Sequence, residues 1–186
     1  MASNMTEKIG ANRASAKTPS LESLDPKAGS GGHARAPFLI DREAAWHYRG
    51  SPIERPALVK LFASILVRNP DGRHWLRTPV EEVEVEVEDA PFLAVALVRH
   101  GQGRAQSLEL CDNLDRWVPV DAAHPLRLAE GAGGRPRPYI ALERGLEARI
   151  TRAVFYDLAD LVEPDPEGGD RLGLWSSDRF FPLSAA

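Results

Sequence analysis

Two apolar stripes with helical spacing stand out along the chain. The first has a spacing of three or four positions, which places its members on one face of a helix: Leu58, Leu61, Phe62, Ile65 and Leu66. Pro56 suits the first turn of this helix, and the turn-forming residues 69–72 are expected to end it. A second helix is predicted over residues 152–162, whose apolar side chains again share one side.

Strands are predicted where apolar and polar residues alternate, or where short β-type runs lie between turns. The clearest case is residues 80–89, in which valines face one side of the strand and glutamates face the other. Further strands are predicted at residues 38–40, 46–48, 74–76, 92–98, 107–111, 116–120, 138–142, 172–175 and 180–183. Two helices among many antiparallel strands predict an α+β fold.

An internal repeat accompanies the two helices. Residues 53–61 align with residues 150–158 through the pattern I-x-R-x-x-(L/F)-x-x-L. After each helix a glycine-containing turn leads to a strand that carries a tryptophan, Trp75 or Trp175. We therefore predict two similar small units, each a helix with antiparallel strands.

The composition divides the chain into three parts. Residues 1–36 hold almost no large apolar side chains, so they cannot bury enough surface to offset the loss of backbone entropy on folding. We expect a disordered N-terminal tail there. An N-terminal α+β subdomain is predicted over residues 37–80, and a β-rich C-terminal subdomain with one helix over residues 81–186.

Charge and composition exclude several classes of function. The chain of 186 residues has a net charge of −4, and its tail is net positive, so the remainder is the more acidic part. An acidic folded part is a poor binder of nucleic acid, whose affinity comes from neutralised phosphates. No apolar run approaches the roughly 20 residues of a membrane helix, and the first ten residues lack the apolar core of a secretory signal. We therefore expect a cytoplasmic protein that binds neither nucleic acid nor membrane.

The signatures of common enzyme classes are absent from the sequence. There is no P-loop, no dinucleotide-binding glycine loop and no G-x-S-x-G elbow. The five histidines lack metal-ligand spacing, and the single cysteine, Cys111, cannot build a thiolate metal site. We expect no metal and no cofactor, and we favour a non-catalytic protein over an enzyme.

Polar residues within apolar strings are the candidates for binding. Arg55 and Arg152 occupy equivalent places at the two predicted helix N-termini, where a cation opposes the helix dipole and requires a compensating anion. That anion is either a ligand phosphate or carboxylate, or Asp89 or Glu143 in a structural ion pair. His124 and Asn113 lie in predicted loops, where binding residues concentrate.

A string of short motifs resembles a known bacterial family. The motifs are S-P-I-x-R at 51–55, L-V-K-L-F-A at 58–63, T-P-V-E at 78–81, V-E-D-A-P-F at 87–92, H-P-L-R at 124–127, P-Y at 138–139 and V-F-Y-D-L at 154–158. In this order, over about residues 37–183, they resemble domain-of-unknown-function family 1285. The resemblance implies a two-part α+β fold with a duplicated core and a C-terminal part similar to pleckstrin-homology domains. It also implies a ligand, with a nucleotide as one candidate, between the two parts and a role in signalling, but no catalytic residues.

The leading hypothesis is a non-catalytic module that holds a small anionic ligand, with a nucleotide as one candidate, at the interface of the two subdomains. Its binding residues are basic, aromatic or polar: Arg55, Arg127 and Arg152 for charge, Tyr139 and Tyr156 for stacking, and Asp89, Asn113 and His124 for polar contacts. Binding would shift the two units relative to each other, and a partner would detect that shift in signal transduction.

Two alternatives belong to other classes. A protein–protein adaptor without a small ligand predicts a contiguous exposed apolar patch. A hydrolase or transferase whose acid and base come from Asp89, His124 and Glu143 predicts that His124 lies within hydrogen-bonding reach of a carboxylate in an open pocket.

Overall fold

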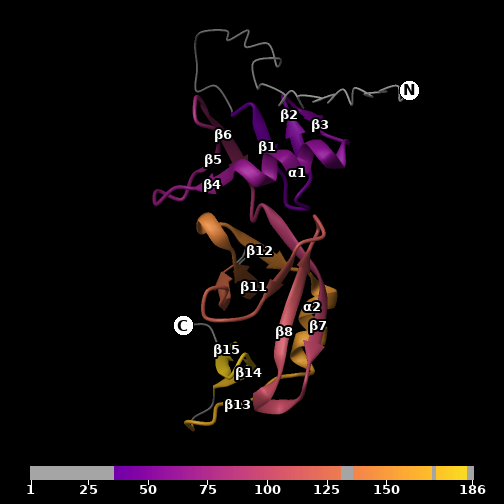
Figure 1. The fold of residues 1–186 in the computed structure, drawn as a ribbon, viewed down its shortest axis with the longest axis vertical. Coiled ribbons are helices and arrows are strands. Elements are labelled where there is room, and N and C mark those ends of the chain that lie inside the picture. The colour runs from indigo at the N-terminus through magenta and orange to yellow at the C-terminus, as the bar shows by residue number, and fades with distance from the viewer. Residues whose placement is uncertain (1–35, 131–135, 169–170, 184–186) are drawn as a thin grey trace, which may run out of the picture. The chain divides into compact units, whose positions relative to one another are not determined.

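The structure is a computed structural model that describes residues 36–130, 136–168 and 171–183 (Figure 1). These residues contain two α-helices, two six-stranded mixed sheets and one three-stranded sheet. The predicted α+β fold with two similar units is therefore confirmed. The expected disordered tail lies almost entirely outside the described residues and stays a prediction.

The first sheet has the strand order β3-β2-β1-β6-β5-β4. Its strands in chain order are β1 (Phe38–Ile40), β2 (Trp46–Tyr48), β3 (Ser51–Pro52), β4 (Leu66–Arg68), β5 (His74–Arg77) and β6 (Glu82–Val87). Each set of three consecutive strands is antiparallel, and the first and last strands, β1 and β6, pair in parallel at the centre. Pairing with β1 and β5 places β6 in the first sheet, whereas the expected boundary at 80/81 assigned it to the second subdomain.

The second sheet repeats this plan, with the order β10-β11-β12-β7-β8-β9. Its strands are β7 (Phe92–His100), β8 (Ser107–Asp112), β9 (Trp117–Pro119), β10 (Leu126–Glu130), β11 (Pro136–Ala141) and β12 (Glu147–Ile150). Again the first and last strands, β7 and β12, pair in parallel at the centre, between two antiparallel sets. The two units thus share a topology in which the last strand of each sheet pairs in parallel with its first strand.

The two helices have different places in their units. Helix α1 (Pro56–Ile65) connects β3 to β4 and so joins the two antiparallel halves of the first sheet in the chain. Its Phe62 packs on Phe38 and Trp46, with ring centroids 5.1 and 6.0 Å apart. Helix α2 (Arg152–Ala159) follows the second sheet, packs on β7 and leads to the small third sheet. The predicted order of helix and then hairpin is present twice, but only the first hairpin joins a six-stranded sheet.

The predicted ends of both helices are wrong. The first apolar stripe includes Leu66, but this residue leaves the helix and begins β4, where it is fully buried opposite Leu76. The second helix ends at Ala159, because Asp160 forms its C-cap and the chain then extends into β13 (Glu163–Pro164). Among the strands, β3, β4, β10, β12 and β13 were not predicted.

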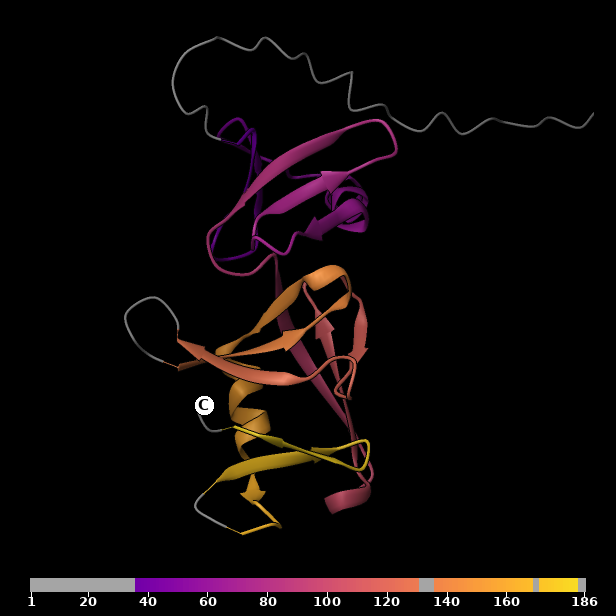
Figure 2. The ribbon, with the colours of Figure 1, turned by 90° about the vertical axis from the view of Figure 1, so that its left-hand side faces the viewer.

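The third sheet, drawn in yellow in Figure 2, comprises β13, β14 (Leu172–Ser176) and β15 (Arg179–Pro182). Buried hydrogen bonds attach it to the second unit. Gln106 donates its amide to the Trp175 carbonyl at 2.7 Å, and the Ser176 hydroxyl donates to the Val120 carbonyl at 2.6 Å. Because these groups are buried, losing either partner would leave an unsatisfied polar atom. No structural observation bears on the expected likeness to pleckstrin-homology domains, which stays a prediction.

No helix of the described residues is long and apolar enough to cross a membrane.

Gly173→Ala tests how closely the hairpin of the third sheet is packed. An added Cβ would lie 2.4 Å from the Phe181 carbonyl oxygen and 2.6 Å from the Phe180 ring, so the backbone would have to move. We expect a loss of about 3 kcal/mol in the free energy of unfolding, the upper end of the range for overpacking, measured by urea denaturation. The matched control is Gly50→Ala, where a Cβ meets no atom of the described residues within 4 Å and only the φ of +82° is unfavourable. The control should lose about 1 kcal/mol, and equal losses in the two variants would contradict the packing argument.

Candidate functional site

Asp89 lies in the connection between β6 and β7 and is the centre of an ionic cluster. Its carboxylate accepts a hydrogen bond of 2.6 Å from the Tyr139 hydroxyl and one of 3.0 Å from Arg137. The Nε atom of Arg149 lies 3.0 Å from the same carboxylate, and the Asp89 side chain is only 14% exposed. Two hydrogen bonds and one further ion pair therefore compensate this acid. We use the name Asp89 cluster for Asp89, Arg127, Arg137, Tyr139, Glu147 and Arg149.

Arg127 and Glu147 form the second half of the Asp89 cluster. Two parallel contacts join them, Nε to Oε1 at 2.5 Å and Nη2 to Oε2 at 2.6 Å. The Arg127 guanidinium also lies over the Tyr139 ring, 4.8 Å from its centroid. Arg68 on β4 lies 3.6 Å from Glu147, so the cluster connects strands of both units. The structure thus brings together three predicted site residues, Asp89, Arg127 and Tyr139, but their polar groups are already paired with one another and with neighbours.

Burial changes the acidity of two groups at this junction. Burial, assisted by the hydrogen bond to Asp89, raises the pKa of Tyr139 to about 12. Burial, assisted by the nearby charge of Arg68, lowers the pKa of His74 to about 4. Both groups are therefore neutral in the folded protein near pH 7.

The other predicted residues lie elsewhere. Arg55 is the exposed N-cap residue of α1, whereas Arg152 begins α2 and bonds through its guanidinium to the hydroxyl of Tyr156 at 2.9 Å. Asn113 accepts a hydrogen bond of 3.1 Å from the Leu93 amide beside the bulge in β7, which is a structural contact. These four of the eight predicted residues therefore do not join Asp89, Arg127 and Tyr139 in a common site.

The predicted structural ion pair of Arg55 or Arg152 with Asp89 or Glu143 is not formed within the described residues. Asp89 pairs with Arg137 and Arg149 because the connection that carries it crosses β11 and β12 rather than a helix start. Within the described residues, no ion pair joins Arg55 or Arg152 to a carboxylate.

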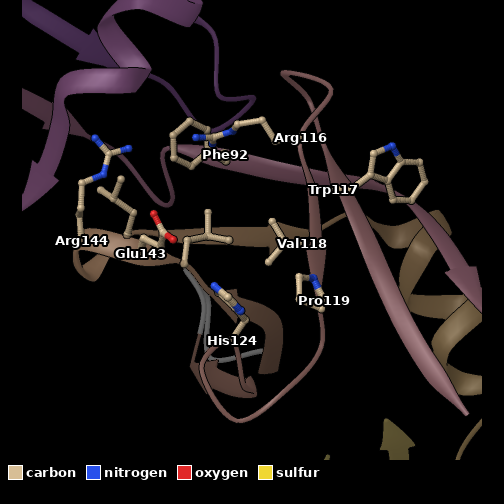
Figure 3. Close-up of a pocket in the computed structure, with 10 residues that line it drawn as sticks. Phe92, Arg116, Trp117, Val118, Pro119, His124, Glu143 and Arg144 are labelled. Atoms are coloured by element: carbon tan, nitrogen blue, oxygen red, sulfur yellow. The ribbon is translucent and has the colours of Figure 1, made fainter. Parts of the chain in front are cut away.

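His124, the eighth predicted residue, lines a pocket of about 290 Å³ in the second unit (Figure 3). The walls come from β9, from the loop before β10 and from the segment between β11 and β12. The Nδ1 atom of His124 lies 3.0 Å from the Asp121 carboxylate. Burial alone would raise the pKa of Asp121, but hydrogen bonds from the His124 amide and ring lower it, so this carboxylate stays charged.

The rim of the pocket carries a stacked arginine and an exposed tryptophan. The Arg116 guanidinium lies over the Phe92 ring, 4.2 Å from its centroid, and is held at 2.7 Å by Asp112, a carboxylate that is only 3% exposed. Trp117 on the edge strand β9 is 50% exposed. Figure 3 shows this indole on the opposite side of β9 from Val118 and His124, so its ring does not face into the pocket.

Glu143 and Arg144 complete the pocket from the 3₁₀ turn Glu143–Gly145. Arg144 has a positive φ of 58°, which is unfavourable for a residue with a side chain. Its guanidinium donates to the carbonyl oxygens of Ser64 and Ala63 in the last turn of α1, and Figure 3 shows this side chain reaching toward the purple ribbon of the first unit. These carbonyls would otherwise lack partners at the helix end, so Arg144 caps α1 from the other unit.

The titratable and charged side chains that line the pocket are Arg116, His124, Glu143 and Arg144. Within the described residues, its lining contains no serine, threonine or cysteine, and no group of three or more His, Cys, Asp or Glu side chains is placed to hold a metal ion. Sequence reasoning missed Arg116, Trp117 and Arg144. Trp117 could have been noticed, because Pro119 in the same short strand indicates a sheet edge. No sequence signal identifies Arg144.

Tyr139→Phe tests the buried hydroxyl through its alkaline titration. The hydroxyl has an ordinary pKa of 10.0 and a folded pKa of about 12, so the unfolded chain ionises first as the pH rises. The wild-type protein should therefore lose stability from about pH 10 toward pH 12, and the variant should lose less over the same range. Unfolding free energies measured by urea denaturation at several pH values check this. Parallel curves for the two proteins would contradict a buried neutral hydroxyl.

Two family models match successive parts of the chain. Residues 29–90 match the N-terminal domain of unknown function DUF1285, and residues 91–183 match the C-terminal domain of the same protein family of unknown function. The boundary between the matches falls in the connection that carries Asp89. No curated protein matches the chain.

Two solved structures are similar to this chain. A DUF1285 family protein from Silicibacter pomeroyi DSS-3 has 43% sequence identity and a TM-score of 0.75, over 81% of this chain and 81% of that one. A DUF1285 family protein from Shewanella baltica OS155 has 32% identity and a TM-score of 0.55, over 67% of this chain and 91% of that one. The resemblance indicated by the sequence motifs is confirmed, and the chain belongs to the DUF1285 family, a family of unknown function.

Proposed function

We propose that this protein is a non-catalytic binding module that holds a small anionic ligand in the pocket lined by His124 and Arg144. One observation carries the proposal. Arg144 lines the pocket and donates only to backbone carbonyls, with no carboxylate partner among the described residues, whereas Arg116 at the same pocket is neutralised by Asp112. A cation without a counter-charge at a pocket wall favours an anionic ligand.

A nucleotide is the ligand class that uses most of the pocket. Its phosphate would contact Arg144 and the ring of His124, and its base would pack on the apolar side chains of Val118 and Pro119 in the pocket wall. The Glu143 carboxylate, exposed and without an ion pair in the described residues, would accept a hydrogen bond from a sugar hydroxyl or a base amino group. The volume of about 290 Å³ fits a mononucleotide rather than a larger cofactor.

This assignment changes the roles of the predicted residues. His124 keeps its place in the binding site. Asp89, Arg127 and Tyr139 are assigned to holding the junction between the units, because their polar groups are paired there. Arg55, Asn113, Arg152 and Tyr156 are given no role in the pocket.

The proposed signalling role rests on two interactions of Arg144, one with the ligand and one with the end of α1. A ligand anion that attracts its guanidinium competes with the carbonyls of Ala63 and Ser64 for the same N–H groups. Binding would therefore weaken the cap on α1, and detachment of that cap would favour binding, since coupling between two sites is reciprocal. A partner that recognises the end of α1 could detect the ligand. The cytoplasmic location and the absence of nucleic-acid and membrane partners stay predictions.

A hydrolytic role is the second candidate, and one observation favours it. His124 lies 3.0 Å from Asp121 and shares its pocket with Glu143, so a carboxylate orients the ring as in a general base. The carboxylate beside it is Asp121 rather than Asp89, which is fully engaged in its own cluster. The adaptor alternative has less support, because the large exposed apolar residues of the described part come from separate elements: Val80, Val95, Trp117, Tyr156 and Leu172.

A thermal-shift and calorimetric screen of the full chain tests the proposed ligand class. Adenosine monophosphate, other mononucleotides, sugar phosphates and inorganic phosphate are the probes. A ligand at about a hundred times its Kd should add about 2.7 kcal/mol of stability and raise the melting temperature. Arg144→Gln should weaken binding about tenfold or more.

The matched control is Arg55→Gln, which removes an exposed arginine outside the pocket and should leave the affinity unchanged. A flat screen on the folded protein would contradict the proposal and favour a protein partner. Product formation from a bound probe that is lost in His124→Asn would favour the hydrolytic role instead.

Arg144→Gln also tests the coupling between pocket and helix. Removing the guanidinium leaves the last carbonyls of α1 without their donors, so amides in the last turn of α1 should exchange with deuterium faster. Hydrogen exchange followed by mass spectrometry measures this, and the amides of α2 serve as the internal control. A binding probe should produce the same change in the wild-type protein. Unchanged exchange in α1 in both experiments would exclude the coupling while leaving ligand binding itself untouched.

A further inference from the structure

A second cavity, of about 490 Å³, lies beside the third sheet. It is bounded by Arg104 of the 3₁₀ turn η2 (Gly103–Ala105), by residues 165–167 and Arg171, and by the hairpin of β14 and β15. None of its lining residues belongs to the pocket of Figure 3. It is therefore a separate place to which no role has been assigned.

Structural bonds fix the walls of this cavity. Gln106, directly after η2, bonds to the Trp175 carbonyl and accepts the Ser177 amide at 2.9 Å, which places Arg104 over the Trp175 ring at 4.7 Å. On the opposite wall, the buried Asp165 holds Arg171 at 2.7 Å. The site is thus built before any ligand arrives, which lowers the entropic cost of binding.

Four charged side chains of the cavity have no ion pair among the described residues. Arg104 and Arg179 contact only aromatic rings, and Glu167 and Asp178 make no side-chain hydrogen bond or ion pair within the described residues. Although both signs occur among these four side chains, no ion pair of the described residues joins any two of them. A purely anionic ligand would be attracted by the two arginines but repelled by the two carboxylates. A purely cationic ligand would be attracted by the carboxylates but repelled by the arginines. A ligand that carries both charges matches the cavity.

The remaining walls are apolar. The Phe180 ring lies against the backbone of Gly173 and meets Trp175 edge-on, with centroids 5.4 Å apart, and Pro166 and Pro182 complete the surface. Trp175 itself is only 8% exposed, so it supports Arg104 and Phe180 rather than offering a free face. Apolar contact is therefore available from Phe180 and the two prolines.

We propose that this cavity binds a small zwitterion with an apolar body, the chemical class of the free apolar α-amino acids. The ligand carboxylate pairs with Arg104, its ammonium group with Asp178 or Glu167, and its side chain packs on Phe180. The site is independent of the nucleotide pocket and does not rest on the function proposed for it.

Isothermal titration of the full chain with L-leucine, L-phenylalanine and L-methionine tests this. At least one should bind, and its N-acetyl and amide derivatives, which lack one charge each, should bind about tenfold more weakly or worse. Arg104→Gln and Asp178→Asn should each weaken binding by a similar factor. Arg99→Gln is the matched control, because this arginine donates to the Gly101 carbonyl and does not line the cavity.

Four results would overturn the proposal. They are the absence of binding by all three amino acids, equal binding of the N-acetyl derivative, equal binding of the amide, and unchanged affinity in both Arg104→Gln and Asp178→Asn. Melting temperatures of the variants establish that they fold, and Asp178, in an exposed turn, provides a test should Arg104→Gln be unstable. Arg144→Gln should leave amino-acid binding unchanged, and Arg104→Gln should leave nucleotide binding unchanged, so failure of one site is distinguishable from failure of the other.

Discussion

The ionic cluster around the part-buried carboxylate of Asp89 is the interaction on which the junction of the two sheets depends. The chain passes from the central strand β6 of one sheet to the central strand β7 of the other within four residues, and Asp89 lies in that connection. Two guanidiniums and a tyrosine hydroxyl from β11 and β12 surround it. Removing one partner of a buried ionic group leaves an uncompensated charge, which costs several kcal/mol. The junction therefore has one favourable arrangement, and Arg127, Glu147 and Arg68 extend it across the units.

The same constraint explains why part of the fold could be predicted from the sequence and part could not. Both helices and the strand of alternating valines and glutamates could be predicted from local periodicity, which is visible in the sequence without knowledge of tertiary contacts. β10 and β12 escaped detection because each presents an arginine, Arg127 or Arg149, toward the Asp89 cluster. A strand face of charged residues looks solvent-exposed in the sequence, and only the paired carboxylates from distant segments make it a junction. Leu66 was assigned to the helix because it fits the stripe, but burial opposite Leu76 made the strand more favourable.

Candidate site residues were predicted with less success, for a related reason. Arg55 and Arg152 are equivalent in the sequence repeat, but α1 connects β3 to β4 of the first sheet whereas α2 follows the last strand of the second sheet. Equal spacing therefore did not produce equal surroundings. His124 was identified because loop residues on a rigid sheet are often functional. Asp121, three residues earlier, is the group that orients it, and a neighbour at that spacing in a turn is the kind of partner that sequence reasoning can include.

Arg116 and Arg144 show how two arginines at one pocket differ in what they can do. Arg116 has a buried carboxylate at 2.7 Å and an aromatic ring beneath it, so its charge is compensated and its position fixed. Arg144 has neither, and its backbone φ of 58° is unfavourable by about 1–2 kcal/mol. Gly145, beside it, lies so close to Arg68 that an added Cβ would come within 3.2 Å of the Arg68 carbonyl oxygen, which holds the turn against the first unit. A strained backbone is maintained only where other contacts outweigh its cost. Here those contacts are the bonds from the Arg144 guanidinium to the end of α1, so the residue that offers a free charge to the pocket is also the one whose position depends on the other unit.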